Sequence, residues 1–198
     1  MSFYIHIQET PNPNAVKFIS RYTVKTEGSS NYHTPVDAVN NKLAQKLFTF
    51  PGVMQIYFFD NYITITKDPT VAWSDITDDM VELLQQELPN HNPMYNDPGE
   101  EENRAAQREN LAPEILEIEE ILDRTVRSSL AADGGDIEVI ERNGNMIFFK
   151  FLGACGSCPI SSSGTLMAIQ SVLRAELGQD IECVDVGMGG GAEGEAWW

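Results

Sequence analysis

Two thiols three positions apart are the residues of this chain whose types and spacing best suit chemistry. Cys155 and Cys158 stand in the segment GACGSCPIS (residues 153–161), directly after the apolar run MIFFKFL. Pro159 is typical of the first position of a helix, which predicts that Cys158 lies at or near an N-cap. Such a position generally favours the thiolate, the form of cysteine that attacks electrophiles and binds metals. The pair is therefore a candidate redox or metal site.

The residues alone leave several interpretations of this pair open. Two buried apolar thiols are the simplest, although neither helix propensity nor packing requires cysteine at a glycine-lined corner. A thiol–disulfide oxidoreductase also places C-x-x-C between a strand and a helix, but only forty residues follow Cys158 and no further strand–strand–helix pattern is seen.

A zinc ion or an iron–sulfur cluster needs more ligands than the pair provides. Both usually take four, and Cys183 lies a whole helix away from Cys158. His6, His33 and His91 belong to the other half of the chain. Two copies of the cysteine loop would supply four thiolates, so a metal site here predicts a subunit boundary.

The first half of the chain alternates between strand and helix patterns. The patterns predict a strand from residue 3 and a second strand at 16–20. A helix should follow, with Thr34 as its N-cap and an apolar face of Val36, Val39, Leu43 and Leu47. After it we expect a hairpin over 53–67 around Asp60 and Asn61, and a helix over 76–88.

The second half must position the thiols. Its patterns predict a helix from Pro113 to about Leu130 that ends before Gly134 and Gly135, and then a hairpin over 136–153 around Asn143 and Gly144. A last helix is predicted with Leu166, Ile169, Leu173 and Leu177 on one face, followed by a closing strand within 180–187. The predicted fold class is α+β, with two small α+β domains joined by a charged linker. The predicted boundaries are 1–92 for the first domain, 93–112 for the linker, 113–187 for the second domain and 188–198 for a flexible tail.

Charge and composition narrow the classes of partner. A net charge of -17 and a pI near 4.4 argue against direct binding of nucleic acid or anionic membranes, which requires clustered Lys and Arg. Three cysteines are too few for a disulfide-stapled secreted scaffold and indicate a reducing compartment. No apolar run has the length of a membrane span, and the N-terminus resembles neither a signal peptide nor an organelle presequence. A cytoplasmic protein is the expectation.

Two groups of motifs resemble a known family. The C-terminal domain of the NifU-like (Nfu) iron–sulfur cluster proteins resembles three parts of this chain: LAADGGDIEVI (130–140), the hairpin and GACGSCPIS. The domain that precedes it in many members resembles three others: ETPNPNAVKFI (9–19), FPGVMQIYFFDNYITITK (50–67) and the Trp73 segment. The resemblance implies a scaffold or carrier, not an enzyme, that holds a 4Fe-4S cluster between two subunits. It implies Cys155 and Cys158 as ligands, a homodimer when cluster-bound, and apo iron–sulfur clients and upstream cluster-assembly proteins as partners. SSGTLMAIQ after the cysteines departs from the family pattern.

Several other residues are predicted to be structural. Asp133 and Asp136 flank a helix end, and TPNPN (10–14) is predicted to be a structured turn. Cys183 is predicted to lie in the core. Trp197 and Trp198 belong to a tail predicted to be disordered. The first domain has no ligand set of its own and is interpreted as a partner or targeting module.

Overall fold

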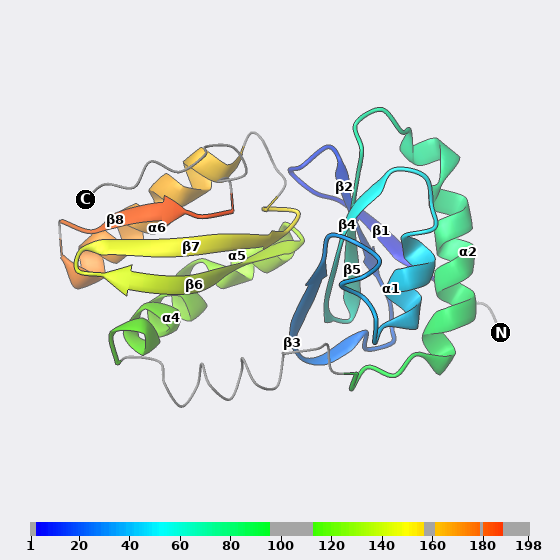
Figure 1. The fold of residues 1–198 in the computed structure, drawn as a ribbon, viewed down its shortest axis with the longest axis horizontal. Coiled ribbons are helices and arrows are strands. Elements are labelled where there is room, and N and C mark those ends of the chain that lie inside the picture. Colours follow the sequence, from blue (N-terminus) through cyan, green and yellow to red (C-terminus); the bar gives the residue numbers. More distant parts are fainter. Residues whose placement is uncertain (1–2, 96–112, 157–160, 179, 188–198) are drawn as a thin grey trace.

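The computed structural model describes residues 3–95, 113–156, 161–178 and 180–187, with the backbone alone at 161–163. Its helices and strands form two units, each built around its own sheet (Figure 1). We call residues 3–95 the N-terminal domain and residues 113–187 the C-terminal domain. The α+β class predicted from the sequence is confirmed, and each domain has a separate apolar core.

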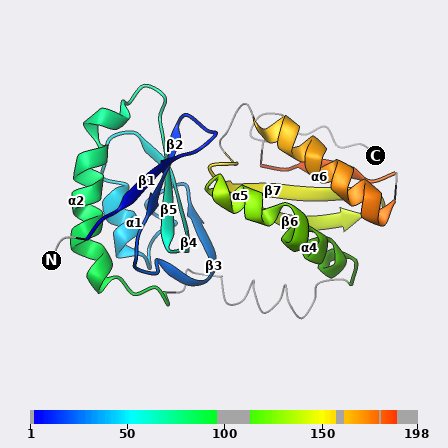
Figure 2. The same ribbon diagram turned by 180° about the vertical axis from the view of Figure 1, so that it is seen from behind.

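The N-terminal domain is a five-stranded antiparallel sheet with helices on one face. Its strands follow the order β1-β2-β5-β4-β3: β1 (His6–Glu9), β2 (Ala15–Ile19), β3 (Lys25–Tyr32), β4 (Val53–Asp60) and β5 (Tyr62–Lys67). The helical elements are α1 (Lys42–Leu47), α2 (Thr77–Glu87) and the short 3₁₀ helices η1 (Trp73–Asp75) and η2 (Leu88–Asn90). Figures 1 and 2 show α1 and α2 on the face turned away from the C-terminal domain.

Strand alternation sorts the side chains of this sheet. Val16, Phe18, Ile56, Phe58 and Ile63 all enter the first core. Because successive side chains of a strand point to opposite faces, their neighbours along the strands point the other way, toward the C-terminal domain. The second face of the sheet is therefore available for an interdomain contact.

The first predicted helix begins later than the sequence suggested. Val36 is 81% exposed and Val39 57% exposed, so neither belongs to a buried helical face. The carboxylate of Asp37 accepts hydrogen bonds from the main-chain N–H groups of His33 and Thr34 and closes a local turn there. The cap of α1 is Asn41. Strand β3 was not predicted, because its sequence KTEGSSNY has a polar, glycine-containing composition.

The C-terminal domain is a three-stranded sheet with all its helices on one face (Figure 2). Its elements are α4 (Pro113–Thr125), α5 (Arg127–Ala132), β6 (Gly135–Asn143), β7 (Met146–Gly153), α6 (Ser161–Leu177) and β8 (Glu182–Asp185). Strands β6 and β7 form the predicted antiparallel hairpin, and β8 pairs in parallel with β7. The predicted last helix and closing strand are confirmed.

Two local details of this domain differ from the prediction. The single predicted helix from Pro113 is divided at Val126, where Thr125 Oγ1 donates back to the carbonyl of Ile121, a bond that bends helices. The hairpin turns one residue later than predicted, because Asn143 pairs with Met146 and Gly144 therefore occupies the first central position with φ of +59°.

The region between the domains starts inside the first core. Tyr95 is 7% exposed and packs into that core, and Lys25 Nζ donates to its carbonyl. Most of the predicted linker, residues 96–112, and the predicted tail, 188–198, lie outside the described residues. The domain boundaries remain predictions.

Candidate functional site

The turn that carries the first thiol is fixed at both ends. β7 ends at Gly153, and the N–H of Gly156 donates to the Gly153 carbonyl over 3.2 Å. The N–H of Ala154 donates to the carbonyl of Gly134 over 3.1 Å, which ties the turn to the corner between α5 and β6. Gly153 has φ of +60°, and a Cβ there would stand 2.5 Å from the Gly134 carbonyl oxygen. Only glycine fits this approach.

Cys155 sits in a hollow that another glycine leaves open. Its side chain is a thiol, half-buried, and packs at the margin of the second core. A Cβ added to Gly135 would lie 2.5 Å from Cys155 Sγ. The Gly134–Gly135 pair and Gly153 thus shape the backbone around the thiol. Cys158, its predicted partner, and the predicted N-cap lie outside the described residues.

Cys183 is a core residue at the opposite end of β7, as predicted. It lies in β8 opposite Ile147, whereas Cys155 follows Gly153. Gly153 lies six steps along the strand from Ile147, which corresponds to about 20 Å. Burial raises the pKa of the Cys183 thiol to about 11, and nearby Arg174 opposes that shift. A buried, protonated thiol at this distance does not belong to the Cys155 turn.

The two acidic residues near the corner have different structural roles. Asp133 is the C-cap of α5, which fits the predicted turn chemistry. Asp136 lies in β6 and is half-buried, and its carboxylate accepts from the N–H of Ile137 over 2.8 Å. Burial raises the pKa of the Asp136 carboxyl, while the Arg127 guanidinium opposes the shift.

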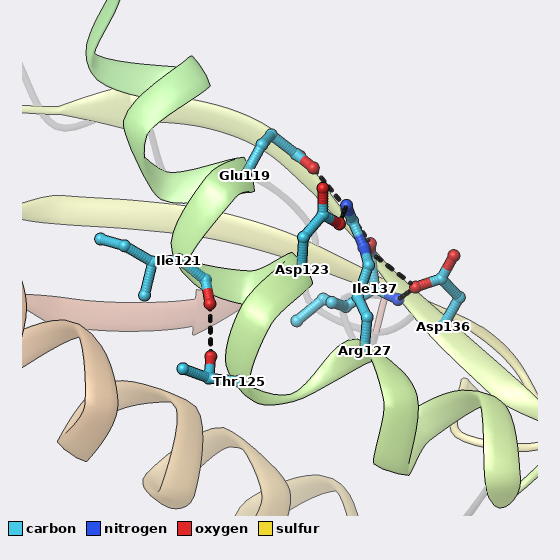
Figure 3. A network of polar contacts seen from close by, with 7 residues as sticks. All are labelled: Glu119, Ile121, Asp123, Thr125, Arg127, Asp136 and Ile137. Atoms are coloured by element: carbon cyan, nitrogen blue, oxygen red, sulfur yellow. Dashed lines mark hydrogen bonds and ion pairs between the residues drawn. The ribbon is translucent and has the colours of Figure 1, made fainter.

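Arg127 joins the helices of the C-terminal domain to the first strand, a role that sequence reasoning missed. Its guanidinium contacts the carboxylates of Glu119 and Asp123 on α4 and lies 3.3 Å from Asp136 Oδ1 (Figure 3). It also donates to the carbonyl of Ile137 over 3.1 Å. The spacing of Asp123 and Arg127, four positions apart, was the available signal. This network holds the strand that leads out of the glycine corner.

The TPNPN segment is a structured turn, as predicted, and it reaches the cysteine turn. Asn12 Oδ1 accepts from the N–H of Asn14 over 3.0 Å, and Thr10 Oγ1 lies 3.0 Å from the carbonyls of Asn12 and Ala15. Asn12 Nδ2 donates to the carbonyl of Ala154 over 3.1 Å. The segment therefore lies directly beside the residue that precedes Cys155.

Other features of the described chain limit the chemistry. Within residues 3–95, 113–156, 161–178 and 180–187, no three His, Cys, Asp or Glu residues gather closely enough to hold a metal ion. In the same ranges no helix is both long and apolar enough to cross a membrane. The described part of one chain thus brings Cys155 alone to the turn, and the sequence adds Cys158.

Comparisons with known proteins agree with this architecture. The family model "Scaffold protein Nfu/NifU N terminal" matches residues 5–91, and the model "NifU-like domain" matches residues 118–184. A NifU-like protein of Schizosaccharomyces pombe is 29% identical over 178 residues, which are 87% of this chain and 68% of the relative. The human mitochondrial NFU1 iron-sulfur cluster scaffold homolog is 29% identical over 172 residues, which are 86% of this chain and 67% of the relative.

A solved structure of a Saccharomyces cerevisiae NifU-like protein also matches, with 33% identity and a TM-score of 0.42 over 44% of this chain and 80% of that one. The two matched regions define a two-domain protein, with an Nfu-type N-terminal domain and a NifU-like C-terminal domain. The cysteine turn beside the double-glycine corner lies in the second of these domains. The chain belongs to the Nfu family of NifU-like proteins. It spans about two thirds of the length of the relatives named here.

Proposed function

We propose that this protein is an iron–sulfur cluster scaffold and carrier that holds a 4Fe-4S cluster between two copies of the chain. The cluster is its cargo, bound by Cys155 and Cys158 of each copy. The single observation that carries the proposal is the separation of the thiols. Cys155 stands in the glycine-lined turn, while Cys183 is buried at the far end of β7.

The dimer is proposed because one chain has fewer thiols than a cluster needs. The iron atoms of such a cluster usually take four cysteine thiolates. One chain offers two suitable thiols, so two chains complete the site. The names of relatives support iron–sulfur cargo, because the human relative is described as an iron-sulfur cluster scaffold homolog.

Transfer requires ligands that can be exchanged. Cys155 is half-buried at the end of a strand and outside the fully buried part of the core. Incoming thiolates of an acceptor can replace the scaffold's thiolates one at a time, which leaves the core folded. The proposed activity is therefore delivery to apo-proteins after loading by upstream assembly proteins, without turnover of a substrate.

The experiment is anaerobic reconstitution followed by sedimentation, with iron, sulfide and visible absorption measured on the same fractions. A brown, cluster-containing dimer is expected, because cluster binding is coupled to the assembly that completes the site. Cys155→Ala and Cys158→Ala should each lose colour and dimer, and Cys183→Ala is the matched control that keeps both. A monomer with a full cluster would contradict the shared site. A colourless zinc-bound or disulfide-bonded protein would favour a structural zinc dimer or the oxidoreductase instead.

The compartment is a separate part of the proposal. The low cysteine count favours a reducing compartment, and the human relative is named mitochondrial. We propose the cytoplasm for this chain. Fractionation of cells that express the protein, with iron measured in each fraction, tests the assignment, and recovery in mitochondria would overturn it.

A further inference from the structure

One row of side chains on the N-terminal sheet contacts the corner that supports the cysteine turn. Lys17 of β2 and Tyr57 of β4 both pair with Thr64 of the strand between them, so the three residues cross the sheet in line. Lys17 Nζ donates to the carbonyl of Ala131, in the last turn of α5, over 2.8 Å. A cation at a helix C-terminus also interacts favourably with the helix dipole.

The other two members of the row approach glycine backbone. A Cβ on Gly134 would stand 2.9 Å from Thr64 Oγ1, and a Cβ on Gly153 would stand 3.0 Å from Tyr57 Cδ1. Gly134 and Gly153 therefore leave room for the N-terminal sheet, while the neighbouring Gly135 leaves room for the thiol of Cys155.

The TPNPN turn adds a directional bond to this contact. Asn12 is 1% exposed, and its Nδ2 donates to the Ala154 carbonyl in a bond that is itself buried. The Oδ1 of the same side chain accepts from the N–H of Asn14, which fixes the amide in this orientation. We call these four contacts the interdomain latch: Asn12 with Ala154, Lys17 with Ala131, Tyr57 with Gly153, and Thr64 with Gly134.

The packing around the latch is incomplete. Thr64 Oγ1 and Tyr62 Oη are buried without a hydrogen-bond partner among the described residues, and a buried hydroxyl in that state weakens the contact that buries it. A pocket of about 370 Å³ that is open to solvent, with a lining that includes Tyr57, Tyr62, Arg127 and Asp136, also lies between the domains, so the two surfaces do not meet everywhere. These features suit an interface that opens.

We propose that the N-terminal domain closes over the cysteine turn of the cluster-free chain through this latch, and that the latch must open before a second chain can approach Cys155. Asn12 and Tyr57 contact the two residues that immediately precede Cys155. A second chain that shares a cluster has to reach the same turn. This inference rests on the proposed function for its purpose, while the closure itself can be tested without a cluster.

The test uses the full apo chain and a pair of variants that shift the latch in opposite directions. Asn12→Asp keeps an acceptor for the N–H of Asn14 but removes the donor and faces a carboxylate toward the Ala154 carbonyl. Thr64→Val keeps the shape and removes a buried hydroxyl that lacks a partner. Asn14→Asp is the matched control, because it makes the same change of charge within the same turn.

The readout is the rate at which iodoacetamide alkylates Cys155, with tandem mass spectrometry used to separate Cys155 from Cys158. Where opening is fast and brief, this rate follows the population of the open state. Loss of one buried hydrogen bond predicts alkylation about tenfold faster in Asn12→Asp. Removal of an unpartnered hydroxyl predicts alkylation about threefold slower in Thr64→Val. Asn14→Asp should match the parent chain.

Hydrogen exchange distinguishes opening from loss of the fold. In Asn12→Asp the amides of Phe18 in the N-terminal sheet and of Phe149 in the C-terminal sheet should both keep their protection, because opening of the latch breaks neither sheet. Equal alkylation of Cys155 in Asn12→Asp, Asn14→Asp and the parent chain would overturn the latch and leave the cluster proposal standing. A parent chain that shows the latch but binds no cluster would overturn the proposed function instead.

Discussion

Gly135 lies so close to Cys155 that a Cβ on the glycine would stand 2.5 Å from the thiol sulfur and 2.7 Å from the carbonyl oxygen of Leu152. The Leu152 carbonyl cannot move freely, since Leu152 pairs with Asp136 in the hairpin. The absence of a side chain at Gly135 therefore sets the place of the sulfur.

Substitution Gly135→Ala should displace Cys155 and weaken both the domain and its cluster. Overpacking of this kind typically costs about 1–3 kcal/mol of unfolding free energy. Urea unfolding and iron content after reconstitution measure the two effects. Gly164→Ala in α6 is the control, because a Cβ there meets no described atom within 4 Å and alanine favours a helix. Unchanged stability and iron in Gly135→Ala would contradict this account of the turn.

Substitution Arg127→Met should destabilise the C-terminal domain by about 2 kcal/mol, because the partly buried Asp136 loses its counter-charge. Burial already raises the pKa of the Asp136 carboxyl in the folded chain. The folded state thus binds this proton more tightly than the unfolded state, so stability falls as pH rises past the ordinary aspartate pKa. The penalty of Arg127→Met should therefore be smaller near pH 4 than at pH 7. Chemical denaturation at both values measures it.

The matched control for this arginine is Arg142→Met, whose ion pair with Glu114 is longer at 3.6 Å and has an exposed acidic partner. It should change stability by less than about 1 kcal/mol at either pH. Adding Asp136→Asn to Arg127→Met should restore part of the lost stability. If the double variant is no more stable than Arg127→Met, the buried carboxylate is not the cause.

Cys183→Ala should lower stability by about 1 kcal/mol and leave the iron content per dimer unchanged. Burial raises the pKa of this thiol to about 11. Its protonated form is thus favoured by folding, and the contribution is complete below the unfolded pKa of about 8.5 and is lost as pH rises toward 11. The alanine variant should show a weaker loss of stability over this alkaline range. An iron loss as large as that of Cys155→Ala would make Cys183 a ligand.

A fragment of residues 111–198 should fold and bind the cluster at least as well as the full chain, because it lacks the latch that has to open. Among the residues that the structure describes, the two cores share none, and every member of the second core lies within 113–187. The checks are circular dichroism, iron content and sedimentation. Residues 1–95 serve as the control that folds and binds none. A folded fragment 111–198 that holds no cluster would show that the N-terminal domain takes part in binding.

The sequence predicted elements best where a residue's neighbours along the chain decide its conformation. The Gly144 hairpin and the helix α6 follow from local turn chemistry and from the spacing of Ile169 and Leu173. The helix predicted from Thr34 was wrong at its start, because Val36 and Val39 gave the right spacing but no buried surface to face. Periodicity alone does not say whether an apolar face is covered.

The candidate site could be predicted only in part for a related reason. The cysteine turn is a local motif, and Cys183 was recognised as core from strand alternation. The bond between Asn12 and Ala154 joins positions 142 residues apart, and no pattern near either residue indicates the other. The ion pair of Arg127 with Asp136 likewise depends on how α5 meets β6, which the chain settles only on folding.

The position of the latch has a consequence for synthesis on the ribosome. The described part of the N-terminal domain ends at Tyr95, and Cys155 is the sixtieth residue after it. At about 5–20 residues per second this interval is roughly 3–12 s, long enough for a small domain of mixed helices and strands to fold. The face that carries Lys17, Tyr57 and Thr64 is therefore already formed when the cysteines appear. A nascent chain is thus able to cover its own thiol turn as soon as the second domain folds.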